Sequence, residues 1–248
     1  MPKFFVPCEN IKENEILINS EDVLHIKKVL RLGVGDKLNL CDGKGYDYQA
    51  EISQIAESEI KCCIISKTKS DTEPNIEVTL IQGLPKASKM EYIIQKTTEL
   101  GIVKIVPCEM SRCVVKLDSK KEKEKKQQRW QKISQEAAKQ SGRGIVPEVL
   151  MPCSFDDAIE IMKNSDLAFA PYECEEETSL KSVLLSNKDI KTVAFMIGPE
   201  GGYDISEIEK LKNAGIKTIT LGKRILRTET AGEAVLAMTM YEIGDINN

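Results

Sequence analysis

The stretch TVAFMIGPEGG, residues 192–202, says more about the fold than any other part of the sequence. Thr192–Ile197 is almost wholly apolar, as in a parallel strand that helices cover on both faces. Ile197–Gly202 has three glycines in five residues, which permits positive φ angles and close approach of the backbone to a ligand. A helix is expected next, at residues 206–214. This order of strand, glycine loop and helix predicts an α/β domain whose ligand lies beyond the carboxyl ends of the strands.

Strands and helices alternate on both sides of this stretch. Apolar strands are expected at residues 76–82, 103–107, 167–170 and 217–221, and helices at 88–100, 120–141 and 230–243. Gly101 and Gly215 are predicted to end the helices that precede them. Two capping boxes are predicted, Ser206 with Glu209 and Thr230 with Glu233. Right-handed crossovers in a mainly parallel sheet are therefore expected.

The first 70 residues have a different pattern, with short strands and glycine turns. Strands are expected at residues 3–6, 36–41, 46–55 and 60–66, which favours a small barrel. A helix is expected to begin near Ser20, with an apolar stripe of Val23, Ile26, Val29 and Leu30. His25 falls outside that stripe, which favours a surface role over that of a catalytic base. The polar segment 67–75 is predicted to be a linker, giving domains at 1–70 and 76–248 joined through 71–75.

The net charge of −4 excludes a histone-like polycation, but the charge is segregated along the chain. Residues 84–147 carry 15 Lys and Arg against 7 Asp and Glu, whereas residues 148–248 carry 10 against 18. The excess of positive charge in the first of these stretches lies mostly in residues 112–116 and 129–143. Backbone phosphates of a nucleic acid are a natural partner for it. The alternative is a solvated helix face. Trp130 lies on an apolar seam with Ile133 and Ala137, so it is predicted to be a core residue.

The cysteine and histidine content argues against a metal site. None of the eight cysteines has C-x-x-C spacing, and His25 is the single histidine. The N-terminus lacks a signal pattern, and no apolar run reaches the roughly 18 residues of a membrane span. We therefore expect a cytoplasmic protein with no metal and no membrane segment, whose thiols are reduced and mostly buried.

Two loops are candidates for chemistry. Ile197–Gly202 lacks the Walker A and G-x-G-x-x-G patterns, and Glu200 would repel a polyphosphate. It suits a ligand that is neutral or cationic where they meet, such as a ribose, an amino group or a sulfonium; the alternative is a tight turn. In Leu221–Ala231, Arg224 and Arg227 could bind phosphate or carboxylate, oriented by Thr228 and Glu229. The alternative for this second segment is a capped helix start with a surface ion pair.

Together these segments strongly resemble the bacterial ribosomal RNA small subunit methyltransferase E family, which methylates N3 of a 16S ribosomal RNA uridine with S-adenosylmethionine (AdoMet). The resemblance spans nearly the whole chain and rests, in order, on FFV, HIKKVLRLGVGD, DGKGYDYQAEI, LPKASKMEYIIQKTTELGI, RCVVK, RWQKISQEAAKQSGR, IGPEGG and LGKRILRTETA. Departures are small: Lys3 stands where Arg is common, and Cys113 where Ser is common. Both leave the RNA contacts less certain than the cofactor loops.

The resemblance implies a PUA-like β-barrel followed by a SPOUT α/β domain with a C-terminal trefoil knot, and a homodimer that acts on 16S rRNA in the small subunit, at uridine 1498. Arg227 or Arg224 would stabilise the uracil anion, and Glu200 or Glu229 would accept its proton or fix a loop. The implied AdoMet-binding residues are Pro171, Tyr172, Glu173, Ile197, Gly198, Pro199, Glu200, Gly201, Gly202, Leu221, Gly222, Ile225, Leu226, Arg227, Thr228, Glu229, Thr230 and Ala231. The candidate RNA-binding residues are Lys3, His25, Arg31, Arg112, Lys116, Arg129 and Arg143.

Three other functions remain open on the sequence. A non-catalytic RNA-binding or ribosome-assembly factor would keep the barrel and the basic stretch without needing the glycine loop and the arginine pair. A related SPOUT enzyme would methylate transfer RNA instead. A nucleotide-dependent Rossmann enzyme is disfavoured because its fingerprint is absent.

Overall fold

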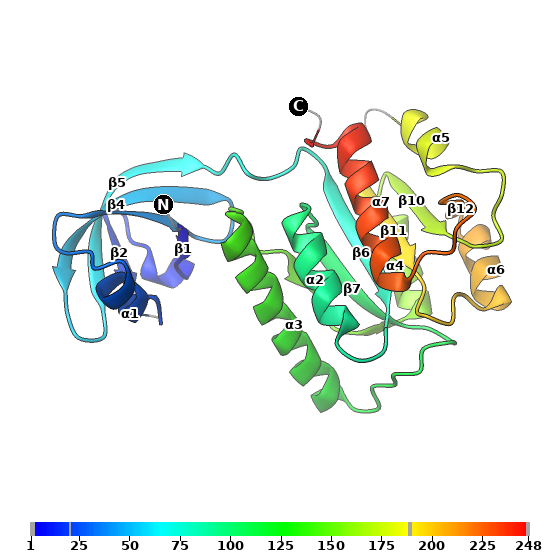
Figure 1. Cartoon of the computed structure of the whole chain (residues 1–248), viewed down its shortest axis with the longest axis horizontal. Coiled ribbons are helices and arrows are strands. Elements are labelled where there is room, and N and C mark those ends of the chain that lie inside the picture. The colour runs from blue at the N-terminus through cyan, green and yellow to red at the C-terminus, as the bar shows by residue number, and fades with distance from the viewer. Residues whose placement is uncertain (1–2, 20, 188–189, 247–248) are drawn as a thin grey trace. The chain divides into compact units, whose positions relative to one another are not determined.

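The computed structural model describes residues 3–19, 21–187 and 190–246, and the chain forms two compact units (Figure 1). The first unit consists of the residues up to Glu73 together with Ala138–Val146. The second unit consists of Pro74–Ala137 and the residues from Pro147 onward. The chain therefore passes between the units three times, and the first unit is not a single continuous stretch.

The first unit contains a five-stranded mixed sheet with the strand order β1-β3-β4-β5-β2. Its strands β1 and β3 are parallel and the other neighbours are antiparallel. In β4, Tyr48, Ala50 and Ile52 are buried, as their alternation with polar residues predicts. The prediction omitted β2 and the short 3-10 turn η1. The bounds are β1 Lys3–Phe5, η1 Cys8–Asn10, β2 Glu15–Ile18, β3 Lys37–Cys41, β4 Tyr46–Ile55 and β5 Ile60–Lys69.

The helix of the first unit departs from the predicted stripe. It consists of α1, Asp22–Leu24, followed by a π-helical turn, η2, His25–Val29; Ser20, its predicted start, lies outside the described residues. Val23 and Ile26 are buried, but Val29 is 66% exposed, so its place in the stripe was wrong. The N–H of Leu30 donates to the carbonyl of His25, five residues back. This wider turn rotates Val29 away from the core.

Residues 67–73 are more ordered than a linker. Lys67–Lys69 belong to β5 and pair with β4, so the linker prediction was wrong for these three residues. The Glu73 carboxylate accepts hydrogen bonds from the N–H groups of Gly144 (2.8 Å) and Ile145 (3.0 Å). Arg143 Nη2 donates to the other carboxylate oxygen at 2.6 Å. Glu73 thus joins the segment 138–146 to the first unit.

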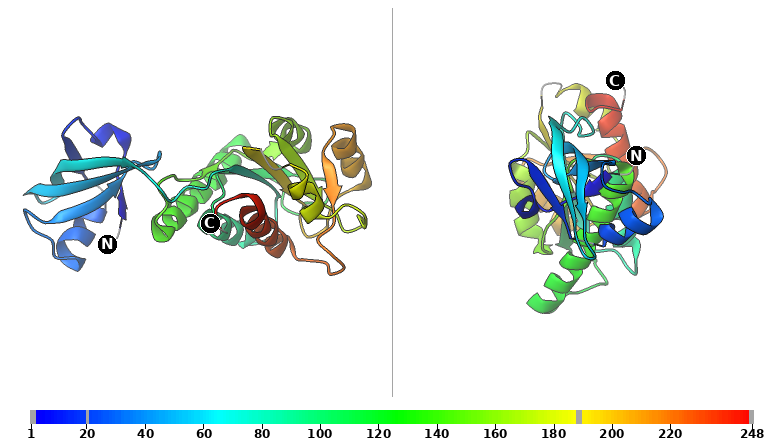
Figure 2. Two further views of the ribbon diagram at one scale, coloured as in Figure 1. Left: turned by 90° about the horizontal axis from the view of Figure 1, so that it is seen from above. Right: turned by 90° about the vertical axis from the view of Figure 1, so that its left-hand side faces the viewer.

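The second unit is built on a seven-stranded sheet in which every strand pair is parallel, which confirms the predicted α/β class. The main order is β12-β10-β11-β6-β7-β8, with β9 also paired to β7. The last five residues of β11 are all buried, because helices lie on both faces of the sheet (Figure 2). The strands are β6 Glu77–Gly83, β7 Lys104–Glu109, β8 Glu148–Val149, β9 Cys153–Ser154, β10 Leu167–Pro171, β11 Thr192–Ile197 and β12 Lys217–Ile219.

The helices of the second unit begin and end close to the predicted positions. Gly101 (φ +94°) and Gly215 (φ +77°) end α2 and α6, as expected. Trp130 is buried in the core, also as expected. The prediction omitted the short α4 and α5. The bounds are α2 Lys89–Glu99, α3 Lys120–Ser141, α4 Phe155–Lys163, α5 Leu180–Leu185, α6 Ile205–Asn213 and α7 Thr228–Ile243.

Both predicted capping boxes were wrong, because the N-cap lies two residues earlier in α6 and three residues earlier in α7. The capping box of α6 is formed by Asp204 and Glu207. Helix α7 has Arg227 at its N-cap and no side-chain cap, and Thr230 and Glu233 lie inside the helix. The hydroxyl of Thr228 does not cap the helix; it forms hydrogen bonds with Gly198 and Gln82.

Candidate functional site

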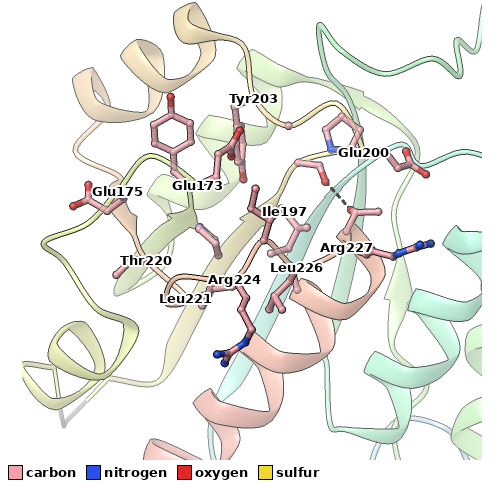
Figure 3. A pocket seen from close by; sticks show the side chains of 18 of the residues that line it. Glu173, Glu175, Ile197, Glu200, Tyr203, Thr220, Leu221, Arg224, Leu226 and Arg227 are labelled. Carbon is pink, nitrogen blue, oxygen red and sulfur yellow. Dashed lines mark hydrogen bonds between the residues drawn. The ribbon is translucent and has the colours of Figure 1, made fainter.

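A cavity of about 1090 Å³ lies in the second unit, where β10, β11 and β12 end (Figure 3). Parallel α/β sheets place ligands at this edge. We call the segments that border it loop A (residues 171–176, after β10), loop B (197–203, after β11) and loop C (220–228, after β12). The lining residues are Lys89, Pro171, Tyr172, Glu173, Glu175, Glu176, Ile197, Gly198, Pro199, Glu200, Gly201, Gly202, Tyr203, Thr220, Leu221, Gly222, Lys223, Arg224, Ile225, Leu226, Arg227, Thr228 and Ala231.

The cavity gathers nearly all of the residues that the sequence singled out for the cofactor. Glu229 and Thr230 are not among the lining residues; they lie in the first turn of α7, and Thr230 is exposed. Ile225 lines the cavity but is 87% exposed, so it lies at the rim. Sequence reasoning missed six lining residues: Lys89, Glu175, Glu176, Tyr203, Thr220 and Lys223. Three of these, Tyr203, Thr220 and Lys223, are immediate neighbours of predicted residues.

Buried Thr228 fastens loop C to loop B. Its hydroxyl donates to the carbonyl of Gly198 (2.6 Å) and accepts from Gln82 Nε2 (2.9 Å). The same Gln82 nitrogen donates to the carbonyl of Gly83 at 2.9 Å. The first residue of α7 is therefore fixed to the ends of β11 and β6. We had expected Thr228 to orient the arginines, but its hydroxyl fixes the loops instead.

Loops A and B approach each other at Gly202. Its φ of +67° is strained for any residue with a side chain, and a Cβ there would lie 2.9 Å from Glu173 Oε1. In loop A, Glu175 accepts a 2.7 Å bond from the Thr218 hydroxyl, which ties the loop to β12. This bond, followed by the Thr178 N–H, lowers the pKa of Glu175. Loop A is thus held from both sides.

Lys89, at the start of α2, bridges two carboxylates that the sequence had assigned to the chemistry. Its Nζ lies 3.0 Å from Glu200 Oε1 and 3.1 Å from Glu229 Oε2. Burial acts to raise the pKa of Glu200, but hydrogen bonds from its own N–H, Lys89 and the Lys86 N–H outweigh it and lower the pKa. Hydrogen bonds to Glu200 and then Glu229 raise the pKa of Lys89. Glu200 is therefore an anchored carboxylate and a weak proton acceptor.

The two arginines of loop C are available cations of the site, and the exposed Lys223 beside them is a third. Arg224 and Arg227 are exposed, and neither has an ion-pair partner within the described part of the chain. Their guanidinium groups point to opposite sides of loop C, with that of Arg227 on the same side as Glu200 (Figure 3). The two guanidinium groups thus offer separate positive charges to anionic groups.

Tyr203 closes the inner wall of the cavity. It is fully buried, and its hydroxyl donates to the carbonyl of Met196 at 2.6 Å. Burial, followed by the negative charges around it, raises its pKa, so the hydroxyl stays protonated. Its ring packs edge-on against Tyr172, with centroids 6.3 Å apart. The inner wall is therefore rigid and largely apolar.

The candidate RNA-binding residues of the second unit are exposed, but each has a partner. Arg112 donates to the carbonyl of Gly201 at 3.2 Å and lies 3.6 Å from Asp204. Lys116 Nζ donates to the Met110 carbonyl at 3.4 Å, and Arg129 pairs with Glu91 at 2.7 Å. Arg112, a candidate RNA contact, therefore also contacts loop B, a candidate cofactor loop.

The candidates of the first unit divide into exposed and buried ones. His25 and Arg31 are exposed, in agreement with a surface role. Lys3 pairs with Asp47 at 2.8 Å and is largely covered. The Arg143 side chain is 4% exposed and pairs with Glu73. Arg143 is therefore a structural residue that a phosphate cannot reach, and we no longer include it among the RNA contacts.

The remaining predictions concern thiols, metals and membranes. All eight cysteines are free, but only Cys41, Cys62, Cys108 and Cys113 are buried, so "mostly buried" was too strong. Among residues 3–19, 21–187 and 190–246, no group of three or more His, Cys, Asp or Glu side chains is placed to hold a metal ion. Over the same residues, no helix combines the length and the apolar character that crossing a membrane requires.

The parallel sheet, its looped cavity and the preceding mixed sheet define an RNA methyltransferase with an N-terminal PUA domain. The family model of the RNA methyltransferase domain matches residues 72–240, and that of the RNA methyltransferase PUA domain matches residues 18–65. The curated ribosomal RNA small subunit methyltransferase E of Bacillus subtilis is 38% identical over 229 residues, which cover 91% of this chain and 89% of that protein. This chain belongs to the ribosomal RNA small subunit methyltransferase E family.

Two solved structures share the complete fold. The Neisseria gonorrhoeae ribosomal RNA small subunit methyltransferase E bound to S-adenosyl methionine is 32% identical, with a TM-score of 0.87 and 99% of each chain covered. A Legionella pneumophila protein in complex with the cofactor SAM is 29% identical, with a TM-score of 0.85 and 98% of each chain covered. Both carry their cofactor on a chain of this architecture.

Proposed function

We propose that this protein transfers a methyl group from AdoMet to N3 of a uridine in 16S ribosomal RNA, at position 1498. The observation that carries the proposal is the cavity of loops A, B and C, which meets two unpaired guanidinium groups at its rim. The family supports the reaction class. Its relatives are named as small-subunit ribosomal RNA methyltransferases, and one of them has a structure with AdoMet bound. The substrate implies action in the cytoplasm.

The residues of the cavity suit AdoMet. A volume of about 1090 Å³ exceeds what a ligand of this size needs. Ile197, Leu226 and Tyr172 supply apolar surface, and the glycines of loop B leave backbone N–H and C=O groups accessible. Glu173 and Glu176 bring negative charge to a ligand with a cationic sulfonium and amino group. The apolar, backbone and carboxylate groups of the cavity therefore match the parts of AdoMet.

AdoMet, when bound, supplies an electrophilic methyl group on a positively charged sulfur. The chain's contribution is to hold the two reactants in line, an effect worth up to about 7–11 kcal/mol for a well-aligned pair. The rigid wall of Tyr203 and Tyr172 and the clamped loops serve that purpose.

Arg227 is our choice for stabilising the uracil oxygens as negative charge develops, because its guanidinium is uncommitted within the described chain and borders the cavity. Arg224 would contact the phosphate or the cofactor carboxylate on the other side of loop C. N3 of uridine is protonated at neutral pH and must lose its proton, which passes to bulk water, as the methyl group is transferred. Glu200 is a weak acceptor for that proton because Lys89 and Lys86 hold its carboxylate, so we assign Glu200 to fixing loop B.

RNA would be held outside the cavity by Lys3, His25, Arg31, Arg112, Lys116 and Arg129. The target base must leave its stack to reach the cavity. We also propose the homodimer and the trefoil knot that the resemblance implies.

The decisive experiment is methyl transfer from labelled AdoMet to small subunits that lack this modification, followed by nucleoside mass spectrometry. We expect 3-methyluridine at position 1498 and at no other site. A different methylated nucleoside, or transfer to transfer RNA alone, would refute the proposed substrate. Absence of AdoMet binding by calorimetry would instead favour the non-catalytic RNA-binding protein.

A further inference from the structure

The segment Met110–Lys116, which we call the basic loop, follows β7 and packs on loop B. It carries the exposed Arg112 and Lys116. Arg112 Nη1 donates to the carbonyl of Gly201 at 3.2 Å, and Nη2 lies 3.6 Å from Asp204 Oδ2. A basic side chain that suits RNA is therefore bonded to the backbone of the cofactor loop.

The contact extends to the backbone of the basic loop. A Cβ on Gly201 would lie 3.0 Å from Arg112 Cβ and 3.2 Å from the Arg112 carbonyl, so glycine is what allows this approach. The N–H of Ser111 donates to Glu207 Oε1 at 2.8 Å, and Glu207 Oε2 accepts from the N–H of Asp204 at 2.9 Å. Glu207 is only 3% exposed. A buried carboxylate thus joins the basic loop to the residue that begins α6.

Met110, the first residue of the basic loop, and Pro199 of loop B both lie close to Gly83. A Cβ on Gly83 would lie 2.6 Å from Met110 Sδ and 2.7 Å from Pro199 Cδ, so both side chains press on this glycine. Ser111 and Arg112 are therefore held against loop B and the start of α6, while Met110 packs on the same glycine as Pro199 of loop B. A displacement of the basic loop moves loop B with it.

The Arg112 guanidinium has donors to spare. It has five N–H groups in a rigid fork, of which the Gly201 bond uses one. The side chain is 44% exposed, so solvent competes with its bonds. A phosphate on the free N–H groups would immobilise the guanidinium and strengthen its hold on Gly201.

We propose that Arg112 is a positioning residue that couples RNA binding to AdoMet binding. RNA on the basic loop orders loop B for the cofactor, and the cofactor in loop B presents Arg112 to the RNA; thermodynamic linkage makes the two effects equal. This inference rests on the proposed function, because it requires loop B to hold AdoMet. We expect RNA to tighten cofactor binding about tenfold, within the usual range of such coupling.

The test measures the dissociation constant of S-adenosylhomocysteine, which cannot donate a methyl group, by equilibrium dialysis with and without unmodified small subunits. The subunits are kept at a saturating concentration, determined for each variant by filter binding. The proteins are wild type, Arg112→Ala, Arg112→Lys and the control Lys120→Ala, an exposed lysine on α3 whose partner is Glu124. The expected ratio of the two constants is about 10 for wild type and the control, near 1 for Arg112→Ala and intermediate for Arg112→Lys.

The outcomes separate the inference from the proposed function. A ratio of 1 in wild type, or an unchanged ratio in Arg112→Ala, would overturn the coupling and leave the methyltransferase assignment intact. Wild-type protein that binds no S-adenosylhomocysteine under either condition would overturn both. A merely structural role for Arg112 would weaken cofactor binding equally with and without subunits, which also contradicts the coupling.

Discussion

The hydroxyl of Thr228 donates a 2.6 Å hydrogen bond to the carbonyl of Gly198, across 30 residues of sequence. Both groups are buried, so the bond has no competition from water. This bond fixes the start of helix α7 against the glycine loop that follows β11.

Thr228→Ala should weaken AdoMet binding about tenfold and destabilise the fold by about 1–3 kcal/mol, because the Gly198 carbonyl and the Gln82 amide lose a buried partner. Thr228→Ser should keep most of both. Isothermal titration and urea unfolding measure the two effects. The exposed Thr230→Ala, two residues along the same helix, is the matched control and should behave as wild type.

Lys89→Gln should also weaken AdoMet binding, because Glu200 and Glu229 are then left without the cation between them. The pKa of Glu200 should rise, since the Lys89 hydrogen bond is one of the contacts that lower it. The deficit should therefore shrink as the pH falls toward 4.5, the ordinary value for this side chain. Lys96→Gln, on the same helix but paired with Glu99, should show no deficit. A deficit that is constant with pH would argue against this electrostatic explanation.

Arg227→Ala should lower kcat by about 10²–10³-fold, the usual loss when one stabilising donor of a developing anion is removed. The melting temperature should not change, because the side chain is exposed and has no ion pair in the described chain. Single-turnover methyl transfer with saturating AdoMet measures the effect. A rise in KM for AdoMet with unchanged kcat would instead assign Arg227 to cofactor binding.

Glu175 should make stability depend on pH. Its pKa is lowered in the folded protein, first by the Thr218 hydroxyl and then by the Thr178 N–H. Its contribution is therefore complete above the unfolded value near 4.5 and is lost as the pH falls through the lower folded value. Wild type should be more stable than Glu175→Gln at pH 7, and the difference should disappear in acid. Urea unfolding at both pH values tests this, with the exposed Glu176→Gln as the control.

Arg143→Ala should cost about 3–5 kcal/mol of stability, because it leaves Glu73 as a covered carboxylate without its cation. The exposed Arg31→Ala should leave the unfolding transition unchanged and weaken RNA binding instead. Thermal unfolding and filter binding distinguish the two. A stable Arg143→Ala protein with impaired RNA binding would restore Arg143 as an RNA contact.

How far the sequence predicted the structure depended on the length of each signal. The strand Thr192–Ile197 and the helix Lys120–Ser141 have the predicted bounds, because each has a long and consistent pattern. The strand Glu15–Ile18 and the two-residue strands β8 and β9 were missed, because so few residues have no period to detect. The apolar stripe predicted for the first helix was wrong at Val29, because the π-helical turn His25–Val29 breaks the 3.6-residue period.

For the site, the sequence indicated the loops but not Lys89, which bridges Glu200 of loop B and Glu229 of α7. Ile197–Gly202 and Leu221–Ala231 were recognisable from their glycines and charges. Lys89 was not, because its role depends on β6 lying next to β11, and strand order leaves no periodic trace in the sequence. The prediction for Arg143 was wrong for a similar reason. An arginine is usually exposed, and this one is buried because it pairs with Glu73, 70 residues away in the sequence.

Because residues 138–146 belong to the first unit, that unit cannot complete its folding early in translation. At about 5–20 residues per second, roughly 4–15 s separate the synthesis of Glu73 from that of Val146. Until then the Gly45 N–H lacks the Gly144 carbonyl, and the Gly43 carbonyl lacks the Val146 N–H. The first 73 residues can collapse early, but they cannot finish folding until more than half of the chain has left the translating ribosome.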